Sequence, residues 1–114
     1  MSIKIDRLNS TFEKEISMIL MEEVKDEDIK FVTITGCDIT NDLSYCKVYF
    51  TVFDQNKKED TLKALNHAKS FIRGELSKRV EIRHTPELTF IYDNSIEYGN
   101  KIEKIIDSIY NEED

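Results

Sequence analysis

The sequence has few of the residues on which several protein classes depend. Among its 114 residues there is no Trp, one Pro, three Gly and two Cys. The three glycines are isolated, which excludes a Gly-rich loop of the kind that cradles phosphate groups. No apolar run approaches the roughly 20 residues of a membrane span, and the N-terminus has no apolar signal-peptide core. We therefore expect a cytoplasmic protein without a membrane partner.

The two cysteines, Cys37 and Cys46, do not form a C-x-x-C motif, which is typical of a protein from a reducing compartment. They are interpreted as two small buried hydrophobic residues, with a disulfide or a metal pair as the alternatives. Two thiols without neighbouring histidines make a poor zinc site. No cofactor or metal is expected.

Catalytic spacing is also missing. His67 and His84 have no sequence neighbour that would form a nucleophile–base pair or a metal site, so both are interpreted as surface residues. The carboxylates are spread over helical faces and turns. We do not expect an enzyme.

Apolar residues make up 39% of the chain and charged residues 34%, with a net charge of -7. This composition and length predict a single domain over residues 1–114 with a core of its own. Helical spacing of Leu8, Phe12 and Ile16 predicts a first helix from about Lys4 to Lys25. Its outer face is acidic, which is interpreted as a solvated face or as a patch that repels RNA and so orients the domain; a further alternative is an adaptor that docks a basic partner protein through this face.

A β-hairpin is predicted from Phe31 to Phe53, because apolar residues alternate in its second strand from Cys46 to Val52. The first strand changes parity, and an extra residue at Thr35-Gly36, a β-bulge, would restore one apolar face. With Asn41-Asp42 as a two-residue turn, Cys37 is expected opposite Cys46. Tyr45, Tyr49 and Phe53 would then lie on the other face, where they are candidates for base stacking or ordinary strand residues.

The second half of the chain predicts a helix, a strand and a helix. Asp60 or Thr61 is the expected cap of a helix that runs to Arg83. A third strand with alternating apolar residues follows Pro86, which fits the start of an edge strand. Asn94 and Glu97 form a capping box before a last helix. The predicted class is α+β, a three-stranded sheet covered by helices.

The charge of the chain is unevenly distributed. Thr61 to Arg83 contains six cations and two anions, so it carries +4 and leaves -11 for the rest of a chain whose total is -7. Small residues lie between cations on the outward face, where a sugar-phosphate backbone could come close. The predicted RNA-binding residues are Lys63, His67, Lys69, Ser70, Arg73, Gly74, Ser77, Lys78, Arg79 and Arg83. The alternative is that these lysines only keep a helix of an acidic protein soluble.

The order of several motifs resembles one family. They are Arg7-Leu8, Glu15-Ile16 to Ile19-Leu20, Glu23 to Asp26, Val32 to Thr35, Asp42 to Tyr49, Ala68 to Arg73, Pro86 to Phe90 and Tyr92 to Ser95. In this order and spacing the chain resembles ribosome-binding factor A, a bacterial family of small-subunit assembly factors. The match extends from about Arg7 to Ile109.

The resemblance implies a type II KH-like domain in the order α-β-β-α-(kink)-α-β-α. The family's kink is an Ala-x-Gly triplet, whereas Ala68, Lys69 and Ser70 stand at these positions here. The implied partners are 16S rRNA and the immature 30S subunit, with ribosomal proteins or assembly GTPases as further candidates. The implied role is to assist late 30S maturation, including processing of the 16S rRNA 5′ end, without catalysing it. The expected oligomeric state is a monomer.

Overall fold

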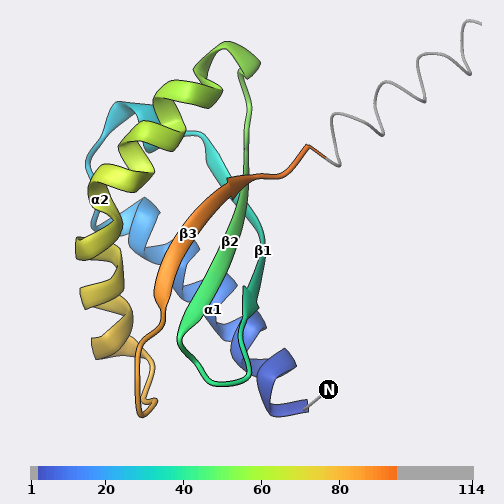
Figure 1. Ribbon diagram of the computed structural model, residues 1–114. Coiled ribbons are helices and arrows are strands. Elements are labelled where there is room, and N and C mark those ends of the chain that lie inside the picture. Colours follow the sequence, from blue (N-terminus) through green and yellow to red (C-terminus); the bar gives the residue numbers. More distant parts are fainter. Residues whose placement is uncertain (1–2, 95–114) are drawn as a thin grey trace, which may run out of the picture.

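In the computed structural model, which describes residues 3–94, two helices pack on one face of a three-stranded sheet (Figure 1). Helix α1 spans Ile3–Glu22 and helix α2 spans Lys58–Arg79. The strands are β1 (Val32–Ile39), β2 (Tyr45–Val52) and β3 (Glu87–Tyr92). Two short 3-10 turns, η1 (Glu27–Ile29) and η2 (Gln55–Lys57), precede β1 and α2. The predicted last helix, with the capping box at Asn94 and Glu97, lies outside the described residues.

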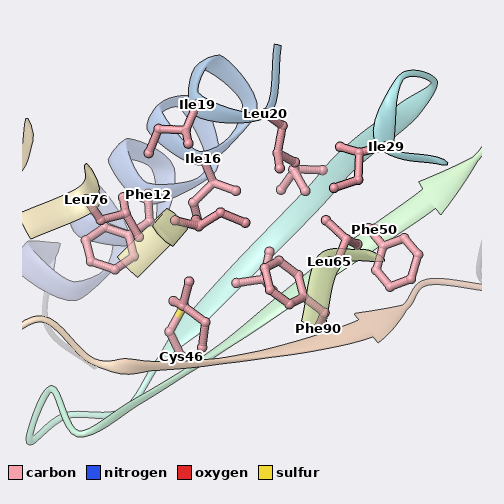
Figure 2. Close-up of a cluster of buried hydrophobic side chains, with 14 of the residues drawn as sticks. Phe12, Ile16, Ile19, Leu20, Ile29, Cys46, Phe50, Leu65, Leu76 and Phe90 are labelled. Carbon is pink, nitrogen blue, oxygen red and sulfur yellow. The ribbon is translucent and has the colours of Figure 1, made fainter. Parts of the chain in front are cut away.

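The sheet has the order β1-β2-β3, with β1 antiparallel and β3 parallel to the central strand. α1 packs mainly against β1, and α2 against β3. Both helices bury apolar side chains against the same face of the sheet (Figure 2). Phe12, Ile16 and Ile19 of α1, Phe50 of β2 and Leu76 of α2 are fully buried there. The predicted α+β arrangement of a sheet covered by helices is confirmed.

The first helix is shorter than predicted, since it ends at Glu22 instead of near Lys25. The carboxylates that follow oppose the helix dipole at its C-terminus. One of them, Asp26, instead accepts a hydrogen bond from the amide of Asp28 (3.0 Å) and caps η1. None of the helices within residues 3–94 is long and apolar enough to cross a membrane.

The predicted bulge is confirmed, because the pairing of β1 and β2 shifts by one residue between Ile34 and Gly36. The predicted register is wrong by two residues: Cys37 pairs with Val48, and Cys46 pairs with Ile39. The loop is longer than the two-residue turn, with Leu43 at a φ of 63°. A slip of two residues leaves every side chain on its predicted face, since the period of a strand is two.

Side chains hold the longer hairpin loop. Thr40 Oγ1 donates to Asp42 Oδ1 (2.8 Å), and the same carboxylate oxygen accepts from the amide of Ser44 (3.1 Å). The amide of Thr40 donates to the carbonyl of Tyr45 (2.9 Å) and closes the loop. Because these bonds depend on particular side-chain positions, apolar periodicity alone did not predict the register.

Cys37 and Cys46 are free thiols that lie on the helix-covered face without being directly paired. Cys46 is buried and Cys37 is half-buried. Interaction with Cys46, together with burial, raises the pKa of the Cys37 thiol. The interpretation of both residues as small buried hydrophobics agrees with this placement.

The second helix begins earlier and ends earlier than predicted. It starts at Lys58, directly after η2, whose cap is Asp54; Asp60 and Thr61 are inside the helix and do not cap it. It ends at Arg79, because Val80 is extended and buried, and its amide donates to the carbonyl of Leu76 (2.8 Å). β-branched residues favour such an extended exit.

The kink implied near Ala68 to Ser70 does not divide the helix into two. α2 runs continuously from Lys58 to Arg79, through Ala68, Lys69 and Ser70. None of these three residues is a helix breaker. At the third position Ser70 stands in place of the family's glycine, which would lower the free-energy cost of breaking the helix. The kink is instead a bend within one helix, because the axis of α2 changes direction between its green and its gold half (Figure 1). The order of elements is therefore α-β-β-α-β over the described residues.

Candidate nucleic-acid interface

The outer face of α2 gathers most of the predicted RNA-binding residues. Lys63, His67, Ser70, Gly74, Ser77 and Lys78 are all exposed. They lie three or four residues apart, so they share the side of the helix that faces away from the sheet. Lys69 and Arg73 are half-buried at the border of this face, and Arg83 is exposed just beyond the end of the helix.

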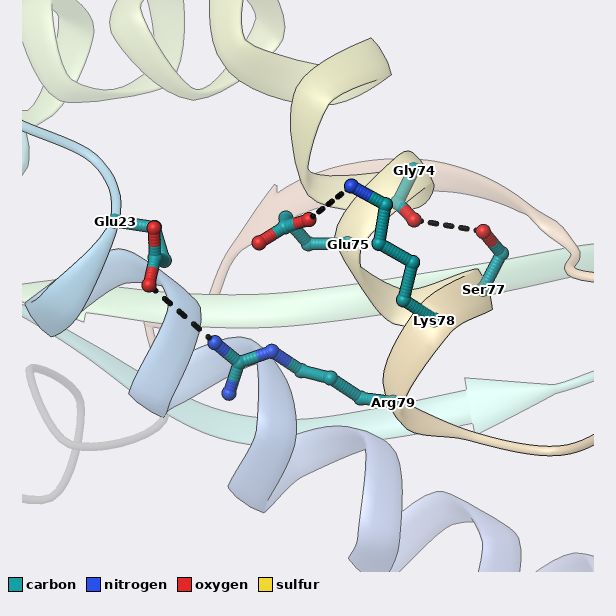
Figure 3. Close-up of polar contacts among 6 residues, drawn as sticks. All are labelled: Glu23, Gly74, Glu75, Ser77, Lys78 and Arg79. Carbon is teal, nitrogen blue, oxygen red and sulfur yellow. Dashed lines mark hydrogen bonds and ion pairs between the residues drawn. The ribbon is translucent and has the colours of Figure 1, made fainter.

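A shallow hollow of about 380 Å³ lies on this face. Its lining consists of Ser70, Arg73, Gly74, Ser77 and Thr85. A Cβ atom at Gly74 would meet nothing within 4 Å, so the glycine leaves an open surface. Ser77 Oγ donates back to the carbonyl of Gly74 (2.7 Å), which keeps this short side chain close to the helix (Figure 3). The small residues thus leave an open depression along the outer face of α2.

Arg73 is held in place beside the hollow. Its Nε and Nη2 both donate to the carbonyl oxygen of Thr85, at 3.1 and 2.7 Å. A guanidinium group has five N–H donors, so this fork uses only part of them. The contact holds the segment before β3 against α2. It also keeps the Arg73 side chain ordered beside the hollow, where its guanidinium group carries a positive charge.

Lys78 and Arg79 are neighbours in sequence but differ in position (Figure 3). Lys78 pairs with Glu75 at 3.1 Å while its side chain stays 78% exposed, so this pair is weak and does not withdraw the ammonium group from solvent. Arg79 turns toward α1, where Glu15 lies at 3.5 Å and Glu23 at 3.8 Å. Arg79 therefore bridges the two helices and lies away from the hollow.

The relatives of the chain place it in one family. Residues 4–106 match the family model of ribosome-binding factor A. Ribosome-binding factor A of Staphylococcus carnosus is 49% identical over 109 residues, which covers 95% of both chains. The protein of the same name from Staphylococcus epidermidis is 47% identical over 110 residues, 96% of this chain and 95% of the relative. The chain belongs to the ribosome-binding factor A family.

Solved structures agree on the fold. The crystal structure of ribosome-binding factor A from Thermus thermophilus superimposes with a TM-score of 0.73 at 22% identity, over 80% of this chain and 97% of that one. A Thermus thermophilus homology model fitted into the cryo-EM map of a 30S–RbfA complex gives a TM-score of 0.61 at 23% identity, over 83% and 97% of the two chains. The KH-like fold expected from the resemblance to ribosome-binding factor A is confirmed.

One exposed aromatic residue beside the predicted RNA-binding residues was not among them. Phe71 is 48% exposed on α2, four residues after His67 and three before Gly74. In the sequence, Phe71 is an aromatic residue next to the polar residues of the outward face, and this position could have indicated that it is exposed. The position of Arg79 could also have been foreseen, because it follows the buried Ile72 by seven residues and so lies on the same side of the helix.

The aromatic residues of the hairpin do not form one surface. Tyr45 is 57% exposed and Tyr49 is half-buried on the face of the sheet opposite the helices, with Lys47 between them. Phe53 follows the end of β2 and lies in another hollow, beside Phe31. Within residues 3–94 no group of three or more His, Cys, Asp or Glu side chains could hold a metal ion.

Proposed function

We propose that this chain is a monomeric, cytoplasmic and non-enzymatic assembly factor of the small ribosomal subunit. Residues 1–114 form a single KH-like rRNA-binding domain. It binds immature 30S subunits through 16S rRNA and assists their late maturation, including processing of the 16S rRNA 5′ end, which a separate nuclease catalyses. The outer face of α2 is the proposed contact with the RNA.

The hollow on α2 is the observation that carries this proposal. It places small residues beside a fixed Arg73, on the helix face that also carries the exposed Lys63 and Lys78, in a chain whose other segments are acidic. Phosphate contacts position a protein on RNA without reading its sequence, and they need cations around a surface that the backbone can reach. The chain belongs to the ribosome-binding factor A family, and the Thermus thermophilus relative was fitted into the map of a complex with the 30S subunit. Both facts point to the small subunit as the source of that RNA.

The residues have different roles in this proposal. Lys63, Lys69, Lys78 and Arg83 neutralise phosphates, and Arg73 does so with the donors that Thr85 leaves open. Ser70, Gly74 and Ser77 allow close approach, while His67 and Phe71 lie beside them as polar and stacking contacts. Arg79 positions α2 against α1 instead of binding phosphate. About five neutralised phosphates predict a slope of roughly -4 in a plot of log affinity against log salt.

The test is co-sedimentation of the full chain with immature small subunits. Lys63→Glu/Lys78→Glu changes two exposed side chains of α2 without touching the Arg73–Thr85 contact. Lys14→Glu/Lys25→Glu makes the same change in net charge at exposed positions on and after α1. We expect the α2 variant to lose binding and the control to keep it, with unchanged melting curves. Equal binding by both variants would remove α2 from the interface.

The maturation step needs its own measurement. Cells that lack the protein should accumulate 16S rRNA with unprocessed 5′ ends, and the Lys63→Glu/Lys78→Glu variant should fail to restore the mature end. The purified protein should not cleave precursor rRNA. If the variant restored the mature 5′ end, maturation would not depend on binding through α2.

The adaptor function remains as the alternative, through the acidic face of α1. Glu15 of α1, and Glu23 directly after the end of α1, already face Arg79. Neutralising Glu15, Glu22 and Glu23 distinguishes the two proposals: the adaptor function is favoured if this abolishes subunit binding while the α2 variant binds normally.

A further inference from the structure

A hollow of about 930 Å³, the α1 hollow, lies at the end of the molecule where the hairpin loop is. Three segments meet around it: the first half of α1, the loop between β1 and β2, and the segment that joins α2 to β3 (Figure 1). Its apolar lining consists of Ile5, Leu8, Leu43, Val80 and Ile82. Concave and mostly apolar sites of about 300–1,000 Å³ typically enclose a group of the size of a small molecule, whereas protein partners need a broader surface.

The walls of the α1 hollow are held by the core. Leu8, Leu43 and Ile82 are partly buried and pack against the core cluster. Leu43 has a φ of 63°, a left-handed conformation that leucine rarely adopts. Its amide donates to the carbonyl of Thr40 (2.9 Å) within the hairpin loop, which holds the residue in this conformation. Backbone strain of this kind is common at ligand-binding sites, and a preformed pocket costs less to order when a ligand binds.

The rim of the α1 hollow is cationic. Lys4, Arg7 and Arg83 line it together with one carboxylate, Glu81. Arg7 and Arg83 are exposed, and neither pairs with a carboxylate in the part of the chain that the structure describes. Asp42 is not in the lining, and its carboxylate accepts hydrogen bonds within the hairpin loop. An apolar floor beside two such guanidinium groups suits a ligand that combines an apolar part with an anion.

The α1 hollow borders the candidate RNA-binding face. Arg83 lines it, and Thr85, two residues further on, lines the hollow on α2. The hydrogen bonds from Arg73 to Thr85 hold this segment against α2. An RNA strand on the outer face of α2 therefore reaches the α1 hollow by crossing the segment between α2 and β3. Phosphate contacts on α2 read no sequence, whereas an unpaired base can leave its stack and be held between apolar side chains.

We infer that the α1 hollow binds one unpaired nucleotide of the RNA that lies on α2. The base packs against the apolar lining, and the phosphates on either side of it bind Arg7 and Arg83. Asn41 and Thr11, which also line the hollow, hydrogen-bond the edge of the base. The inference rests on the proposed function and adds to it a site that contacts a base.

The first test is an NMR titration of the full chain, labelled with ¹⁵N, with two short single-stranded oligonucleotides of equal length. One is RNA that contains all four bases, and the other has the same ribose-phosphate backbone without bases. We expect the RNA to cause saturable shifts of the amides around the α1 hollow, from Lys4 to Thr11, Asn41 to Ser44 and Val80 to Arg83, and also of α2 from Lys63 to Ser77. The abasic strand should shift the amides of α2 alone.

The two surfaces report separately in this titration. Shifts of α2 alone with both strands, or equal shifts around the α1 hollow with both, would overturn the inference and keep the proposed contact on α2. Shifts around the α1 hollow with the RNA but none in α2 with either strand would contradict the contact on α2 and keep the nucleotide site. Absence of shifts with both strands would overturn both.

The second test uses Arg7→Gln, because Arg7 is not among the residues proposed to bind RNA through α2. Lys14→Gln is the matched control, since it removes the same charge at an exposed position of α1 outside the hollow. Arg7→Gln should weaken binding of the RNA at least about tenfold, the loss expected for a charged hydrogen bond, and the control should lose much less. Both variants should keep the melting temperature of the unchanged protein. Equal affinities of the two variants for the RNA would overturn the inference.

Other occupants give distinct results. Shifts of the same amides with a peptide that alternates Leu and Glu, but not with RNA, would assign the α1 hollow to an acidic protein segment. NOE contacts from Leu43 and Ile82 to residues 95–114 in the free chain would assign it to the chain's own end. Shifts of these amides that depend on protein concentration without RNA would assign it to a second copy. Each of these outcomes contradicts binding of a nucleotide.

Discussion

Gly74 lies inside α2 on the outer face, and a methyl group added there would meet nothing within 4 Å. Glycine in a helix interior costs about 0.8–1.0 kcal/mol relative to alanine. Gly74→Ala should therefore stabilise the fold by about that amount, which raises the melting temperature by about 4 °C in a domain of this size. If a phosphate backbone approaches the helix at the hollow, the same methyl group keeps it away. We expect the affinity for small subunits to fall about tenfold, or ~1.4 kcal/mol.

The assay pairs thermal unfolding with co-sedimentation at fixed salt concentration. Ser10→Ala is the matched control, since Ser10 is exposed on α1 and the change stabilises a helix by about 0.5 kcal/mol away from the proposed interface. The control should gain stability and bind as the unchanged protein does. A Gly74→Ala protein that is more stable and binds equally well would refute close approach at the hollow.

Three further changes test the contacts that hold the fold. Arg73→Met removes both hydrogen bonds to the Thr85 carbonyl and should lower the free energy of unfolding in urea by about 1.5–3 kcal/mol. A decrease below about 0.5 kcal/mol, the usual range of surface changes, would show that the contact does not hold the segment before β3 against α2. Thr61→Val removes the hydrogen bond from the buried Thr61 hydroxyl to the carbonyl of Asp28 and should cost about 0.5–1.5 kcal/mol, whereas Thr51→Val, at a half-buried position in β2, should cost less. The hydrogen bond between the two thiols raises the pKa of Cys37 and lowers that of Cys46, so the folded pair keeps one proton where both unfolded thiols ionise. Stability should therefore fall as the pH rises through about 9; Cys37→Ala should remove this fall, and a variant with the same alkaline slope would contradict it.

The parts of the fold that depend on periodicity could be predicted from sequence. Apolar spacing predicted the buried side of α1 and the shared face of β1 and β2, including the bulge near Gly36. The register could not be predicted, because Thr40 and Asp42 hold a longer loop whose bonds do not follow from apolar periodicity. A slip by two residues satisfies the same apolar pattern.

The candidate interface could be predicted from the sequence in its charge but not in its geometry. The basic stretch indicated α2, and its small residues indicated where a backbone could approach. The side of α2 on which Arg79 lies follows from its spacing to Ile72, but its partners Glu15 and Glu23 depend on how α1 packs against α2, which a single helix does not reveal. Exposure of Phe31 and Phe53 likewise follows from where the strands end, since an aromatic residue next to a strand would ordinarily be expected in the core.

Ultraviolet crosslinking of the full chain to RNA in cells, with sequencing of the RNA and mass spectrometry of the crosslinked peptides, tests the central proposal most directly. The proposal predicts precursor 16S rRNA joined to peptides of α2, within Lys58–Arg79. Crosslinks to unrelated RNAs, or to 16S rRNA through peptides of α1 alone, would contradict it.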